Sequence, residues 1–213
     1  MHPGGHRIHV GGDWSPISLW QHNWIKKNIS SYHNAKMLDL GCGSLRLGHL
    51  LIPEMQPENY IGFDINRNLI NKGIEHEIDN SIIEKKKPKF ITNNDMNFEE
   101  IEDNSLDYVW CYAVFIHVND DTVSKALQNL RHKLKPNAPI YSTFHFNETR
   151  PSRVAKKFGS KPKEDYVYDD KQQAWGRTPA EIKKLFKDND YDLSPWQDVT
   201  PKTQYLYKSI STL

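Results

Sequence analysis

The sequence predicts an α/β fold, a three-layer αβα sandwich around a seven-stranded, mostly parallel sheet with an antiparallel closing hairpin. Three observations support this prediction. Short apolar runs alternate with stretches of helical periodicity over the first two thirds of the chain. The central runs are almost wholly apolar, as in DYVWCY at 107–112, which is typical of parallel strands covered on both faces. The last third instead has one well-marked helix followed by two strand-like runs, which suits an antiparallel pair.

The parallel part is predicted from five strand-like runs and the helical stretches between them. The strand-like runs lie at 36–40, 59–64, 89–92, 106–112 and 138–146. Helices are expected at 45–54, 67–79 and 120–134, with a further one before the first strand at 16–30. Asn66 and Asn119 are placed to cap the second and third of the inter-strand helices.

The closing part begins with a strong helix start. Thr178 is a suitable N-cap, Pro179 suits the first helical position, and Glu181 completes a capping box. This helix should end around Asn189. Two runs follow, at 191–199 and 203–210, and we expect them to pair antiparallel at the end of the sheet.

Composition excludes several classes of protein. Hydrophobic residues make up 37% of the 213 residues and charged residues 26%, so a disordered, collagen-like or coiled-coil chain is not expected. The net charge of +1 predicts no general attraction to nucleic acid or anionic lipid. Two cysteines do not make a disulfide framework, and no apolar run is long enough to cross a bilayer. The first residues, MHPGGHRIHVGGDW, contain no apolar secretion segment, so we expect a cytoplasmic protein.

The stretch MLDLGCGSLRLG, residues 37–48, carries the first functional signal. A hydrophobic strand runs into Gly41-Cys42-Gly43 and then into a helix. Glycines let a ligand approach the backbone closely, and the following helix start offers N–H groups to an anionic group. A tight strand-to-helix turn of purely structural role uses the same glycines, so this signal needs a second one.

That second signal is Asp64, at the end of the next strand and 21 residues after Gly43. In open α/β sheets an acid at this point accepts hydrogen bonds from an adenosine ribose. Dinucleotides and S-adenosylmethionine (SAM) are both bound in this way. A dinucleotide loop needs a third glycine to pack helix on strand, and this chain has Arg46 at that position, which disfavours an NAD-type oxidoreductase.

On these residues the chain resembles the class I SAM-dependent methyltransferases. Asp39-Leu-Gly41-Cys-Gly43 matches their first motif, and Asp64 matches the acid of their second strand. Asn94-Asp95-Met96 resembles the adenine-binding segment, 106–118 the fourth-strand motif, and 134–138 the turn before the fifth strand. The chain departs from the pattern at Leu45, where a third glycine often lies, and at Asn137-Ala138, where Gly-Gly is more usual.

The resemblance implies a SAM-binding methyltransferase domain at 36–213, preceded by an N-terminal helical or lid segment at 1–35. It implies that SAM is the cofactor and S-adenosylhomocysteine (SAH) the product, and that the methyl group passes to an O or N atom of a small-molecule acceptor. The implied cofactor-binding residues are Asp39, Gly41, Cys42, Gly43, Arg46, Asp64, Ile65, Asp95, Met96 and Cys111.

Two histidines are candidate general bases. Transfer to a hydroxyl or an ammonium requires removal of a proton, and a histidine ordinarily titrates near neutrality. His117 follows the fourth strand and His145 lies late in the fifth. Each also fits a packing or capping role. His2, His6 and His9 have no acidic or thiolate partner at a ligand spacing, so we expect no metal site.

The sequence also allows other hypotheses for the function. The Lys-rich segment 150–163 could dock a protein or RNA substrate, and the chain could be a catalytically silent SAM-binding subunit of a larger assembly. Segments 1–16 and 150–176 are expected to be mobile and could form a lid. Arg7, Arg153 and Arg177 could hold an anionic acceptor, although a solvated arginine is the expected role for each.

Overall fold

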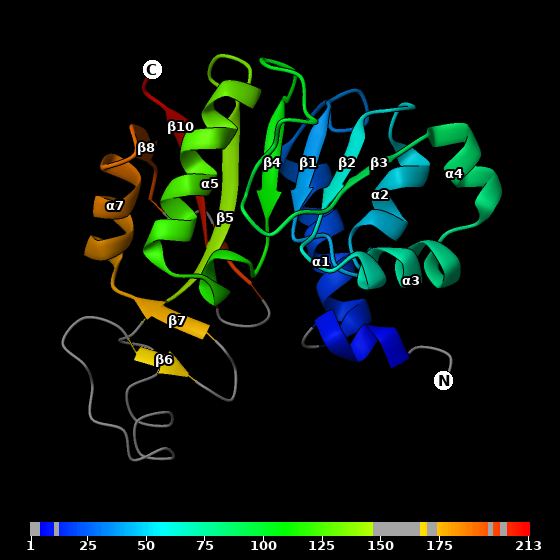
Figure 1. Ribbon diagram of the computed structural model, residues 1–213, viewed down its shortest axis with the longest axis horizontal. Coiled ribbons are helices and arrows are strands. Elements are labelled where there is room, and N and C mark those ends of the chain that lie inside the picture. The colour runs from blue at the N-terminus through cyan, green and yellow to red at the C-terminus, as the bar shows by residue number, and fades with distance from the viewer. Residues whose placement is uncertain (1–4, 11–12, 147–166, 170–173, 196–197, 201–203) are drawn as a thin grey trace.

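The computed structural model describes residues 5–10, 13–146, 167–169, 174–195, 198–200 and 204–213. Its main sheet has the strand order β3-β2-β1-β4-β5-β10-β8 (Figure 1). The parallel strands are β1 (Met37–Leu40), β2 (Tyr60–Phe63), β3 (Lys89–Ile91), β4 (Tyr108–Cys111) and β5 (Pro139–Phe146). These are the five strands that the apolar runs predict.

The antiparallel end of the sheet is also confirmed. β10 (Tyr205–Ser211) pairs antiparallel with β5 and with β8 (Tyr191–Leu193). The run predicted as one strand at 191–199 is split, because β9 (Asp198–Val199) pairs with β10 at a separate register, Tyr205 opposite Val199. The predicted seven-stranded path is therefore present, with β9 added beside it.

Helices cover both faces of the sheet. α5 (Asp120–Lys133) and α7 (Pro179–Lys187) pack on the face that carries Leu38, Leu40 and Val109. α1 (Trp14–Asn28), α2 (Gly48–Glu54) and α3 (Arg67–Glu77) pack on the opposite face, beside Met37 and Trp110. Side chains alternate between the faces along β1 and β4, as a sheet buried on both sides requires. The three-layer prediction is confirmed (Figure 1).

The predicted helix caps are present as hydrogen bonds. Asn66 accepts from the backbone N–H of Asn68 and Leu69 at the start of α3, and Asn119 accepts from Thr122 at the start of α5. The Thr178–Glu181 capping box of α7 is complete. Such caps stabilise a helix by about 1 kcal/mol each, since they satisfy N–H groups that lack a partner within the helix.

Several elements were not predicted. α4 (Asn80–Lys86) follows α3, and two short 3-10 helices occur, η1 (Gly5–Val10) and η2 (Phe115–His117). β6 (Val167–Asp169) pairs with β7 (Ala174–Arg177), and β7 lies parallel to the end of β5, with Gly176 opposite His145. η1 and the hairpin β6–β7 both lie at the lower edge of Figure 1, toward which the arrow of β4 points.

Some expectations concern residues outside the described ranges. Most of the segment 150–176, including Arg153 and the Lys-rich stretch 150–163, lies outside them, as do residues 1–4 and 11–12. The mobility expected of 1–16 and 150–176 therefore stays a prediction. Among the helices that the structure describes, none combines the length and apolar character that a bilayer crossing requires.

Candidate functional site

The site predicted from sequence lies where the parallel strands end. The loop after β1 is fastened to β2, because the backbone N–H groups of Gly41 and Cys42 both donate to the carbonyl of Phe63, at 2.7 and 2.9 Å. Gly41 and Gly43 have φ angles of +79° and +55°, in the left-handed region that glycine tolerates. Leu45, at the position of the usual third glycine, is also left-handed with φ +64°. The backbone therefore keeps the turn shape that the motif requires despite the side chain there.

The loop after β1 touches the turn after β4. A Cβ at Gly41 would lie 2.1 Å from Cγ2 of Val114, a distance at which no side chain fits. Val114 is the residue just before η2. The missing side chain at Gly41 thus serves close packing between two strand-end loops as well as an unusual backbone angle.

Asp64 is held by the loop that it faces. Its Oδ2 accepts from the N–H of Gly43 at 2.9 Å, and its Oδ1 accepts from the N–H of Asn66 at 2.8 Å. Burial raises the pKa of this carboxyl, and the two backbone hydrogen bonds act in the opposite direction. The carboxylate is therefore oriented before any ligand is present, as a group that is to accept further hydrogen bonds should be.

Asp39 lies beneath the loop rather than at its surface. It is 4% exposed and accepts a hydrogen bond of 2.5 Å from the hydroxyl of Tyr60. Burial raises the pKa of Asp39 to about 7, although Tyr60 and the nearby Arg46 both lower it. Arg46 is itself 9% exposed, with its guanidinium 5.6 Å from the ring centre of Tyr112. These residues connect β1 and β2 to the end of β4.

The raised pKa of Asp39 predicts a pH-dependent stability. The pKa of Asp39 in the folded chain, about 7, is above the ordinary value of an aspartate carboxyl, so the folded state binds more protons between these two values. The free energy of unfolding should therefore fall as pH rises from about 4 to about 7, by up to about 4 kcal/mol for this group. The Asp39→Asn variant keeps an oxygen that can accept from Tyr60 but has no carboxyl to titrate. We expect its stability not to fall between pH 4 and pH 7 on account of this residue, and we expect it to melt at a higher temperature than the wild type near pH 8. Thermal melts followed by circular dichroism across the pH range check this, and parallel slopes for the two proteins would contradict it.

The segment after β3 forms the other end of the site. Asp95 is exposed and accepts from the N–H of Asn97 at 3.1 Å, and Met96 is buried with φ +54°. The backbone carbonyl of Met96 accepts from Asn129 of α5 at 2.8 Å, which fixes the segment against that helix.

Ile65, beside Asp64, is 64% exposed, as a side chain that covers a flat ligand from one side would be before binding. Cys42 and Cys111 are buried thiols whose pKa is raised by that burial.

Unsatisfied polar atoms gather along the same edge. Within the described residues, three buried side-chain oxygens have no hydrogen-bond partner in the loop after β1 and the segment after β3: Ser44 Oγ, Thr92 Oγ1 and Asn93 Oδ1. Buried polar atoms are nearly always satisfied in folded proteins, so each needs an explanation. Together with the Asp64 carboxylate, they lie at the ends of β1, β2 and β3.

The two candidate bases are placed differently. His117 ends η2 and is exposed, and its backbone N–H donates to the carbonyl of Val114 at 2.8 Å. His145 is 5% exposed on β5, next to β7. Both strand-end positions belong to the same corner of the molecule, because η2 packs against β5 and β7. Their catalytic role stays a prediction.

Two of the three arginines considered as anion binders, but expected to be solvated, lie within the described residues. Arg7 makes two hydrogen bonds of 2.7 Å to the carboxylate of Glu77 on α3. Arg177 is fully buried, so the expectation of a solvated arginine is wrong for this residue. It binds Asp120 and two carbonyls of the turn after β4. The sequence around Arg177 does not predict these partners, because they lie between 57 and 62 residues away in the chain.

The aromatic residues before the first strand mostly pack. Trp24 is 8% exposed and lies against Trp110 and Tyr141, with ring centres 5.3 and 5.1 Å away. Trp20 is half-buried, 6.0 Å from the ring of Tyr112 at the end of β4. The helix predicted at 16–30 is confirmed as α1, Trp14–Asn28. The division into a segment at 1–35 and its lid role stay predictions.

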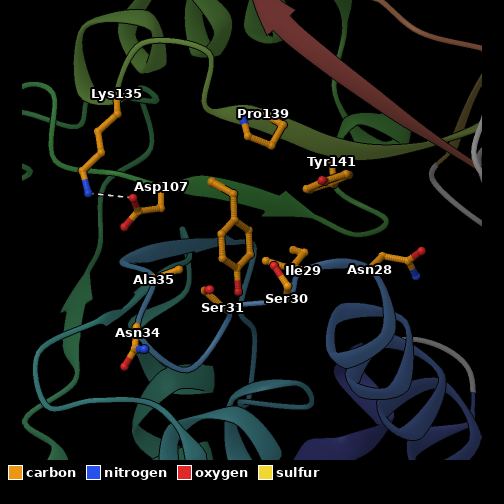
Figure 2. A pocket seen from close by; sticks show the side chains of 11 residues that line it. Asn28, Ile29, Ser30, Ser31, Asn34, Ala35, Asp107, Lys135, Pro139 and Tyr141 are labelled. Carbon is orange, nitrogen blue, oxygen red and sulfur yellow. Dashed lines mark hydrogen bonds and ion pairs between the residues drawn. The ribbon is translucent and has the colours of Figure 1, made fainter.

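A separate cavity of about 520 Å³ lies at the opposite edge of the sheet (Figure 2). It is lined by residues at the starts of β4 and β5, among them Tyr108 and Pro139, and by the segment after α1. The ion pair between Asp107 and Lys135 forms part of its wall. None of the predicted site residues lines it.

By residue type, the histidines near the N-terminus could act as metal ligands. No group of three or more His, Cys, Asp or Glu side chains among the described residues could hold a metal ion. His6 instead lies 2.6 Å from Glu77 and stacks on His76. His2 lies outside the described residues.

Comparisons with known proteins cover the same part of the chain. Residues 38–140 match the family model described as a methyltransferase domain. These residues include the loop after β1, Asp64, the segment after β3 and the turn after β4. No curated protein matches the chain by sequence.

Solved structures share the fold at low sequence identity. The PH0226 protein from Pyrococcus horikoshii is 20% identical, with a TM-score of 0.71 over 95% of this chain and 93% of that one. A SAM-dependent methyltransferase from Methanosarcina mazei is 20% identical, with a TM-score of 0.66 over 87% and 97%. Magnesium protoporphyrin IX methyltransferase from Synechocystis, with bound SAH, is 15% identical, with a TM-score of 0.68 over 97% and 93%. Residues 38–140 therefore match a methyltransferase domain, and the chain shares the fold of solved structures that include SAM-dependent methyltransferases.

Proposed function

We propose that the chain transfers the methyl group of SAM to an oxygen or nitrogen atom of a small-molecule acceptor. The observation that carries this proposal is the set of groups at one sheet edge: the oriented Asp64 carboxylate, the loop after β1, and an exposed histidine on the next strand-end turn. The same edge is flanked by the chain's own segments. Trp20 of α1 lies against Tyr112, and β7 lies beside the end of β5. A site bordered in this way suits a small acceptor better than a large one.

The cofactor residues have distinct expected roles. Asp64 accepts hydrogen bonds from the ribose hydroxyls, and the loop from Gly41 to Gly43 provides backbone N–H groups at close approach. Asp95 and Met96 border the adenine. Arg46, Tyr112 and Cys111 lie toward the end of β4, where the amino-acid part would be held. SAM, when bound, supplies a methyl group that its positive sulfur already activates, so the protein acts mainly by aligning the two reactants.

We propose His117 as the general base for the acceptor. Its side chain is exposed at the strand-end edge, and its backbone is held by the 3-10 turn, so it is both accessible and positioned. A hydroxyl or ammonium acceptor loses a proton as the new bond forms, and a base within hydrogen-bond reach accelerates this step. His145 is the second candidate, since it is buried in the same corner.

Two findings support a small acceptor over a macromolecule. The net charge is +1, so the chain as a whole lacks the basic excess of a nucleic-acid binder. One structural relative is by its name a methyltransferase of magnesium protoporphyrin IX, which is a small molecule. The docking role considered for 150–163 falls outside the described residues.

The test is a methyl-transfer assay with labelled SAM against three pools: small molecules bearing hydroxyl or amine groups, unfolded protein and total RNA. We expect SAH release with members of the first pool, and mass spectrometry then assigns the methylated atom. Label that enters only protein or RNA would overturn the small-molecule proposal. SAH binding without turnover in any pool would favour the silent subunit.

A further inference from the structure

Arg177 occupies an unusual position for a charged side chain. It belongs to β7 and is fully buried. Its Nε donates to Oδ1 of Asp120 at 2.8 Å, its Nη1 to the carbonyl of Phe115 at 2.8 Å, and its Nη2 to the carbonyl of Val118 at 2.7 Å. A buried charge persists only when it is paired and hydrogen-bonded in this way.

The three acceptors belong to one short piece of chain. Phe115 and Val118 bracket η2, and Asp120 is the first residue of α5. The planar guanidinium therefore holds the turn after β4 at both ends and connects it to the following helix. A lysine could carry the same charge but not three donors in this fixed fork.

The same turn is in contact with the cofactor loop. Val114, just before η2, packs against Gly41 so closely that a Cβ there would lie 2.1 Å from Cγ2 of Val114. The next residue back, Ala113, has φ +58° and donates its N–H to Thr143 of β5 at 2.8 Å. A turn with a left-handed residue and a tight contact requires outside support to keep its shape.

We propose that Arg177 is a positioning residue, which holds the turn from 113 to 118 against the Gly41 loop and so couples the hairpin β6–β7 to cofactor binding. This inference rests on the proposed function, because the Gly41 loop is taken as part of the SAM site. Arg177 is fully buried, so it acts through Phe115, Val118 and Val114 rather than at the surface of the site. The connection runs from β7 to η2, which pack against each other, and from Val114 beside η2 to Gly41 in the loop after β1.

The test compares Arg177→Lys with Leu130→Ala. Leu130 is a fully buried residue near the other end of α5, so its truncation lowers stability without removing a bond to the turn. Calorimetric titration with SAH measures cofactor affinity in each protein. We expect the dissociation constant to rise at least about tenfold in Arg177→Lys and to change less than about twofold in Leu130→Ala. An equal effect of the two variants would overturn the proposal.

Hydrogen exchange gives a readout that does not depend on SAH. The N–H of His117 donates to the carbonyl of Val114, so its exchange reports on the turn itself. In the apo protein, we expect this amide to exchange faster in Arg177→Lys than in Leu130→Ala at matched global stability. If wild-type protein does not bind SAH, the proposed function fails, and the exchange comparison still decides whether Arg177 holds the turn.

A second variant covers the case in which Arg177→Lys does not fold. Val114→Ala removes the methyl groups that face Gly41 and leaves Arg177 and its three acceptors intact. Val114 is only partly buried, so the variant should fold. We expect it to weaken SAH binding by about tenfold, and unchanged affinity would break the link between turn and loop on which the proposal depends.

Discussion

Asp64→Ala should weaken SAM binding by roughly two to four orders of magnitude while the protein remains folded. The carboxylate is expected to accept two ribose hydroxyls, and hydrogen bonds to a charged group contribute about 1.5–3 kcal/mol each. The structure strengthens this expectation, because Gly43 and Asn66 already hold the carboxylate in place through their N–H groups. The variant loses these two bonds as well, so a modest decrease in melting temperature should accompany the loss of affinity.

Two further proteins complete this experiment. Asp64→Asn keeps one oxygen as an acceptor but loses the charge, so its affinity should fall between the wild type and Asp64→Ala. Asp103 lies in the loop before β4, and its exposed carboxylate pairs with Lys133 of α5. The Asp103→Ala variant removes this carboxylate and should bind SAM like the wild type. Calorimetric titration measures all four proteins, with circular dichroism as the control for folding. Equal affinities for wild type and Asp64→Ala would show that the ribose is held elsewhere.

His117→Asn should lower turnover roughly 10²–10⁴-fold while SAM affinity changes little. A base that accepts the acceptor's proton contributes about this much to the rate, and asparagine cannot replace it. Because His117 is exposed, its substitution should leave the melting temperature nearly unchanged. Single-turnover kinetics with saturating SAM separate the chemical step from binding.

His145→Asn is the matched comparison for His117→Asn. His145 is buried, so its substitution is expected to lower stability but to spare turnover per folded molecule. The reverse result, with turnover lost only in His145→Asn, would move the base to β5. If neither variant slows the reaction, alignment of the reactants alone accounts for catalysis.

The parts of the fold that could be predicted are those in which local pattern and final structure agree. The strands from β1 to β5 are short apolar runs between helices, and a buried parallel sheet favours such runs. Asn119 and Thr178 cap helices through bonds to residues only three positions away, so their sequence signature is complete in itself. The same holds for the loop at Gly41 and the strand end at Asp64.

The unpredicted parts depend on distant partners. α4 ends in a Lys-rich run, with Lys85 and Lys86 in its last turn and Lys87 as its C-cap. It packs through only a few apolar residues such as Ile82 and Ile83, so its hydrophobic pattern is weak. β7 exists because it pairs with the end of β5, which no local pattern shows. Arg177 is the clearest case. Its burial follows from carbonyls that become available only when η2 and β7 come together.

The most direct test of the account is a calorimetric titration of SAH into the wild-type protein, with NAD⁺ as the competitor. The arrangement of the Gly41 loop, Asp64 and Arg46 predicts saturable binding of one SAH per chain that excess NAD⁺ does not displace. SAH should also raise the melting temperature in proportion to the logarithm of its concentration. Binding of NAD⁺ in place of SAH, or no binding of SAH by the folded protein, would contradict the assignment of this edge as a SAM site.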